Sequence, residues 1–87
     1  MKLFLITFRS LTLAQRAERA MTGEGIACHV RRTPRWMEEK GCGYGVEARL
    51  SQLEQGVGVL REAGIPYRKT YLMHPEGTVE ELRNDLS

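Results

Sequence analysis

Long apolar runs are missing from this sequence. No stretch approaches the roughly eighteen consecutive apolar residues that a membrane-spanning helix requires. The N-terminal residues MKLFLITFRS contain only a short apolar run and no small-residue cleavage site, which is typical of a strand and not of a signal peptide. We therefore expect a cytoplasmic protein that has no membrane partner.

The sequence also has few cysteines and little excess charge, and each shortage excludes further classes of protein. The two cysteines, Cys28 and Cys42, cannot build a disulfide framework, and with His29 and His74 they lack the spacing of a zinc site. We expect no metal and no cofactor. The net charge of +2 is too small to indicate a nucleic-acid partner.

The 87 residues fit one domain, and the domain contains an internal duplication. Two capping-box patterns, Thr12 to Gln15 and Ser51 to Glu54, each predict the start of a helix. Each pattern is followed by a Gly-Ile pair that predicts the helix end, Gly25-Ile26 in the first copy and Gly64-Ile65 in the second. The same offset of 39 residues relates both patterns, so we interpret the chain as two copies of one unit.

Four segments around these helices have the composition of strands. Residues 3–8 are almost wholly apolar, residues 26–32 and 44–50 alternate, and residues 67–73 are rich in strand formers. The order is βαββαβ, which predicts an α+β, ferredoxin-like sandwich: a four-stranded antiparallel sheet with two helices on one face.

The C-terminal residues suggest an addition to this domain. A third capping box, Thr78 to Glu81, predicts a short C-terminal helix, so we divide the chain into a domain over residues 1–75 and a helical extension over residues 76–87. The first strand is apolar on both faces, yet helices cover only one. We expect either this terminal helix or a second copy of the chain to cover the other face, and we favour a homodimer.

The two cysteines lie in different contexts. Cys28 alternates in register with Ile26 and Val30, which predicts a structural, core-facing side chain. Cys42 lies between Gly41 and Gly43, whose missing side chains would let another molecule approach the sulfur. Nearby basic residues would favour the thiolate, the reactive form; they are Arg31, Arg32, Arg35 and Lys40. The residues alone leave two interpretations open, a reactive thiol or a cysteine that occupies a turn.

Several short motifs now resemble a known family. Thr33-Pro34-Arg35, Cys42-Gly43 and the segment LREAGIPY, together with the order of elements, resemble a family of small prokaryotic domains described as selenium/sulfur carrier protein-like. The resemblance covers roughly residues 2 to 73. It implies that Cys42 corresponds to the family's signature cysteine, the acceptor of a sulfur or selenium atom.

The leading hypothesis is a carrier and not an enzyme. A donor protein such as a cysteine desulfurase would load Cys42 as a persulfide or selenosulfide, and an acceptor protein would remove the atom. The alternative is a non-catalytic ferredoxin-like binding or regulatory module that uses the sheet face or the 34–42 segment. A redox-sensing thiol at Cys42 is a third possibility.

Overall fold

The computed structural model describes residues 2–33, 43–76 and 78–82. Its elements are β1 (Leu3–Phe8), α1 (Leu11–Gly23), β2 (Cys28–Arg32), β3 (Tyr44–Arg49), the short 3-10 helix η2 (Leu50–Gln52), α2 (Leu53–Ala63), β4 (Thr70–Met73) and β5 (Val79–Leu82). Up to β4, the order of strands and α-helices is the predicted βαββαβ.

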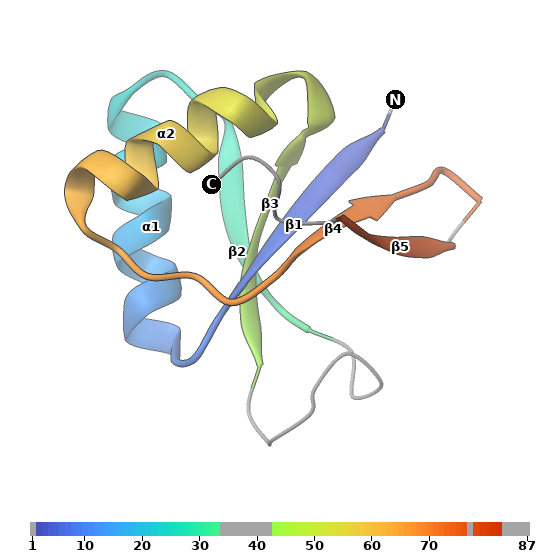
Figure 1. Cartoon of the computed structure of the whole chain (residues 1–87), viewed down its shortest axis with the longest axis horizontal. Helices are drawn as coiled ribbons and strands as arrows, with labels where there is room; N and C mark the ends of the chain where they lie inside the picture. The colour runs from blue at the N-terminus through green and yellow to red at the C-terminus, as the bar shows by residue number, and fades with distance from the viewer. Residues whose placement is uncertain (1, 34–42, 77, 83–87) are drawn as a thin grey trace.

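The strands form one sheet in the order β2-β3-β1-β4-β5, and the paired strands are antiparallel (Figure 1). β1 is central: its Phe8 pairs with Tyr44 of β3, and its Ile6 pairs with Thr70 of β4. The α+β class and the antiparallel sheet are confirmed. The predicted strand number is wrong, because the described residues form five strands instead of four.

The core lies between the sheet and the two helices, which pack on the same face (Figure 1). Alternate residues of β1, namely Phe4, Ile6 and Phe8, are fully buried and belong to the core cluster. The helices contribute Ala14, Ala17, Met21, Val57 and Leu60 to that cluster. Gly56 of α2 is buried, and a side chain there would touch Met21 and Phe4. The helices therefore pack closely against the sheet.

Both helices begin at residues other than those that the capping boxes predicted. α1 is capped by Ser10, whose Oγ accepts a hydrogen bond from the Leu13 backbone N–H at 3.2 Å. α2 begins after η2, and its N-cap, Gln52, makes no side-chain capping bond. The predictions at Thr12 and Ser51 are therefore wrong, because a hydroxyl two residues earlier caps α1 and a 3-10 turn replaces the cap of α2.

The two α-helices end in the same way, as the predicted duplication requires. Gly25 and Gly64 both have positive φ angles, +84° and +70°, which glycine adopts without steric cost. The following isoleucines are fixed in the same way: Ile26 N–H donates to Met21 O, and Ile65 N–H donates to Leu60 O, each at 3.0 Å. Both pairs are related by the 39-residue offset, so the predicted repeat is a structural one.

The predicted C-terminal helix is wrong over the residues that the structure describes. Residues 79–82 form β5, and Val79 pairs with Met73 of β4. The Thr78 hydroxyl donates to the Glu76 carboxylate at 3.1 Å instead of capping a helix. Pairing with β4 satisfies backbone groups that an open sheet edge would leave unpaired, and this gain overrides the local helix signal. Residues 83–87 lie outside the described residues.

The sheet face opposite the helices is less open than the sequence suggested. Leu5 is 0% exposed and Tyr71, its partner on β4, is 7% exposed. Gly45 of β3 leaves room for Leu5, because a Cβ built on Gly45 would lie 2.7 Å from Leu5 Cδ1. These apolar side chains are therefore already buried within a single chain.

Candidate functional site

The candidate site is built on the junction of β2 and β3. The last residue of β2, Arg32, pairs with the first residue of β3, Tyr44. Beyond this pair, the Thr33 N–H donates to the Gly43 carbonyl at 3.0 Å, and both residues are buried. Two of the predicted site residues, Thr33 and Gly43, are thus brought together at the end of the sheet.

The remaining residues of the predicted motif are not among those that the structure describes. Pro34, Arg35, Lys40, Gly41 and Cys42 all lie outside the described residues. The prediction that Cys42 is the reactive residue therefore stays a prediction.

Arg31 and Arg32 do not act as a pair, although the sequence groups them. Successive strand residues point to opposite faces of a sheet. Arg31 Nη1 donates to Glu47 Oε2 at 2.6 Å, and His29 Nε2 lies 3.1 Å from Glu47 Oε1. The Glu47 side chain is only 10% exposed, so its charge requires these partners. Arg31 is consequently engaged by a buried carboxylate, whereas Arg32 is exposed at the junction.

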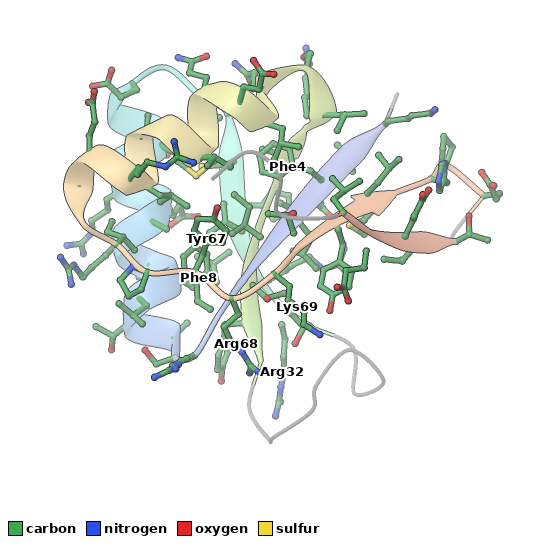
Figure 2. All side chains as sticks on the ribbon, viewed as in Figure 1. Phe4, Phe8, Arg32, Tyr67, Arg68 and Lys69 are labelled. Atoms are coloured by element: carbon green, nitrogen blue, oxygen red, sulfur yellow. The ribbon has the colours of Figure 1, made fainter. Side chains whose placement is uncertain are left out.

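Three basic residues that the sequence analysis did not select lie at the same end of the sheet. Arg9 directly follows β1, and Arg68 is attached to β1 because its N–H donates to the Thr7 carbonyl at 2.8 Å. Figure 2 shows Arg32, Arg68 and Lys69 at this end. A signal existed in the sequence: antiparallel pairing places the end of the first strand beside the start of the fourth, which brings FRS and YRK together.

Cys28 occupies a structural position, as the sequence predicts. Its side chain is partly buried and packs against the core, with Sγ 3.6 Å from Thr22 Oγ1 and 3.7 Å from the Glu18 carbonyl. Burial raises the pKa of the Cys28 thiol above its ordinary value; the hydrogen bond with Thr22 opposes this rise, and the Glu18 carboxylate adds to it. Cys28 therefore stays in the unreactive thiol form near neutral pH.

The described residues contain neither a metal-binding cluster nor a membrane-spanning helix. Across residues 2–33, 43–76 and 78–82, no three His, Cys, Asp or Glu side chains come together in a way that could hold a metal ion. No helix in this part of the chain has the length and apolar character needed to cross a membrane.

Comparison with protein-family models identifies the family of this chain. The family described as "Putative Se/S carrier protein-like" matches residues 3–72. The chain belongs to this family. The match extends from the start of β1 into β4 and spans the β2–β3 connection, so this Se/S carrier-like unit includes the position of Cys42. No curated protein matches the chain.

Proposed function

We propose that this protein is a sulfur or selenium carrier that is loaded on Cys42. The observation that carries the proposal is its membership of the Se/S carrier-like family over a range that includes Cys42. A carrier of this kind interacts with a donor protein and an acceptor protein and needs no catalytic machinery of its own. The proposal places this chemistry in the cytoplasm, where thiols stay reduced.

The comparison of the two cysteines supports the choice of Cys42. The chain has only two cysteines, and burial holds Cys28 as a neutral thiol. Cys42 precedes Gly43, whose carbonyl is bonded to Thr33 at the end of the sheet. The exposed Arg32 ends β2, one residue before Thr33, and the proposal assigns it the role of favouring the Cys42 thiolate. A nearby guanidinium favours the thiolate.

The loading step is a sulfur exchange that needs no external oxidant. The Cys42 thiolate attacks the outer sulfur of a persulfide on the donor, such as the one that a cysteine desulfurase carries. The S–S bond of the donor breaks, the donor cysteine leaves as a thiolate, and a new S–S bond forms on Cys42. Transfer to the acceptor repeats the exchange in the opposite sense. The selenium version forms a selenosulfide in the same way.

The charges at this end of the sheet support docking of acidic partner surfaces. Arg9, Arg32 and Arg68 are exposed, and each approaches the junction from a different segment of the chain. Separate segments that present one sign of charge steer an oppositely charged protein toward that end. Arg31, which the sequence analysis grouped with the basic residues around Cys42, is less suited to docking than Arg32 because Glu47 already neutralises it.

The first test is the intact mass of the reduced protein after incubation with a cysteine desulfurase and cysteine. We expect a gain of one or more sulfur atoms on the parent protein and on Cys28→Ser, and none on Cys42→Ser. The Cys28→Ser variant is the matched control, because it removes the other thiol and leaves the proposed site intact.

Three results would overturn this assignment. Loading that persists in Cys42→Ser and disappears in Cys28→Ser would move the site to Cys28. Absence of loading on all three proteins, with the desulfurase and also with a small-molecule persulfide, together with slow alkylation of Cys42, would favour the alternative of a non-catalytic binding module. Disulfide-linked dimers through Cys42 under mild oxidant would favour a redox-sensing thiol instead.

A further inference from the structure

A pocket of about 430 Å³ opens beside the first turn of α1. One wall is the segment that leads into β4. The described residues that line the pocket are Arg9, Leu13, Pro66, Tyr67, Arg68 and Lys69. Its volume lies within the range of about 300 to 1,000 Å³ that is usual for sites of small ligands.

Backbone hydrogen bonds hold the wall of this pocket in place. Thr7 of β1 makes a set of contacts with the wall: its N–H donates to the Lys69 carbonyl at 2.9 Å, and its Oγ1 accepts from the Lys69 N–H at 3.1 Å. The Arg68 N–H donates to the Thr7 carbonyl at 2.8 Å. Figure 2 shows Tyr67, Arg68 and Lys69 in succession along this segment. The wall is thus fixed to the central strand before any ligand binds. This lowers the conformational entropy that binding would cost.

The residues that line the pocket carry an excess of positive charge. Three of the six residues that line the pocket are cations, and no carboxylate is among them in the described part of the chain. Lys69 is partly neutralised, because its Nζ lies 3.4 Å from Glu81 Oε1. Arg9 and Arg68 are exposed and lie on two different segments. Arg9 also precedes the positive end of the α1 dipole, which adds to the field that an anion experiences there.

The rest of the lining is apolar. Leu13 is partly buried in the first turns of α1, Pro66 follows the end of α2, and the Tyr67 ring packs against the core. A ring or a short hydrocarbon chain can pack on these groups, whereas a bare inorganic ion gains nothing from contact with them.

We propose that this pocket binds a small phosphate monoester. Arg9 and Arg68 hold the phosphate, since the planar guanidinium fork matches phosphate oxygens and two such groups offset a dianion. The organic part of the ester lies on Leu13, Pro66 and Tyr67. This inference does not depend on the sulfur exchange at Cys42, because no residue of the pocket takes part in that exchange, although Arg9 and Arg68 are also assigned to partner docking.

The test uses phenyl phosphate as the probe, titrated into the isotope-labelled protein by NMR and into the unlabelled protein by calorimetry. We expect saturable binding that weakens as salt is added, because salt screens exposed charges. Inorganic phosphate should bind more weakly, because it leaves the apolar surface uncovered, and phenol should not bind. The backbone signals that shift should include those of Leu13, Arg68 and Lys69.

Matched variants separate this site from general attraction to a basic protein. Arg9→Gln and Arg68→Gln should each weaken the affinity for phenyl phosphate by about tenfold, because hydrogen bonds to charged groups are the stronger class. Arg49→Gln is the control: Arg49 is also an exposed arginine, but it lies at the opposite end of the sheet, where it pairs with Leu3. Circular dichroism of each variant checks that the fold is retained.

Three outcomes would overturn the proposal. One is the absence of saturable binding, and a second is equal loss of affinity in Arg49→Gln and the two pocket variants. The third is an acidic peptide that shifts the same signals while phenyl phosphate does not, which would make the pocket part of a protein-docking surface. Cys42→Ser should bind phenyl phosphate as tightly as the parent protein while it loses sulfur loading, so failure of either proposal can be recognised separately.

Discussion

At the scale of single residues, Glu47 and Cys28 show how burial decides what a polar group can do. The Glu47 side chain is only 10% exposed. This burial of a carboxylate is tolerated because Arg31 and His29 both contact it. Among the described residues no cation is paired with Cys28, and burial favours its neutral thiol. The same desolvation therefore produces a paired charge at one residue and an inert thiol at the other.

The raised pKa of Cys28 predicts a particular dependence of stability on pH. Below the pKa of the thiol in the unfolded chain, its stabilising contribution is fully present. As the pH rises through the higher pKa of the folded state, that contribution is lost, because the unfolded chain gains more from ionisation. We expect the free energy of unfolding of the parent protein to fall, relative to that of Cys28→Ala, between about pH 7 and about pH 10.

Urea unfolding of both proteins at each pH measures this effect, and the tyrosines and lysines that also titrate in this range cancel in the comparison. Parallel pH profiles for the two proteins would contradict the assignment. In the same samples, iodoacetamide should modify Cys28 more slowly than Cys42 near neutral pH.

At the scale of elements, α1 shows how a hydroxyl close to the predicted cap becomes the actual cap. Ser10 has an extended backbone, with φ −146° and ψ 160°, and its side chain accepts from the Leu13 N–H. Thr12 lies within the first turn and is exposed. The helix thus begins two residues before the box pattern indicates.

Two alanine substitutions test this cap. Ser10→Ala should lower the free energy of unfolding by about 1 kcal/mol, because it removes the acceptor of an N-terminal backbone N–H. Thr12→Ala, the matched control, should change it by less than about 0.5 kcal/mol, as expected for an exposed site. Chemical denaturation measures both values, and a larger loss in Thr12→Ala would restore the capping box.

The strands show a different balance between local and distant effects. The residues of β1 predict a buried central strand from composition alone, and β1 is central. Residues 79–82 predict a helix from their local pattern but form a strand, since the edge of β4 supplies backbone partners that the pattern does not reveal. Of the two edge strands, β2 was predicted from its alternating pattern and β5 was not.

At the scale of the whole molecule, the homodimer predicted from the sequence loses its main argument. That argument was an apolar sheet face without cover, yet Leu5 and Tyr71 on that face are buried in one chain. Among the described residues, Leu11 is the only large hydrophobic side chain that is exposed, at 40%. One such residue is far short of the roughly 1,200 Å² or more that a stable interface buries.

We therefore expect the protein to be a monomer of 9.9 kDa at micromolar concentration. Light scattering coupled to size exclusion measures this mass directly. A mass near twice that value would support the homodimer after all, formed through a surface other than the one that the sequence indicated.

The sequence by itself determined the family, the α+β order of elements, the glycine helix ends, the repeat and the structural role of Cys28. These features depend on local periodicity and on backbone conformations that only glycine adopts readily, and both are visible in the order of residues. The tertiary structure alone decided two other features: that residues 79–82 join the sheet, and that Arg31 forms an ion pair with Glu47. Each of these depends on which strands become neighbours, and neighbours are chosen by the burial and backbone pairing of segments far apart in the chain.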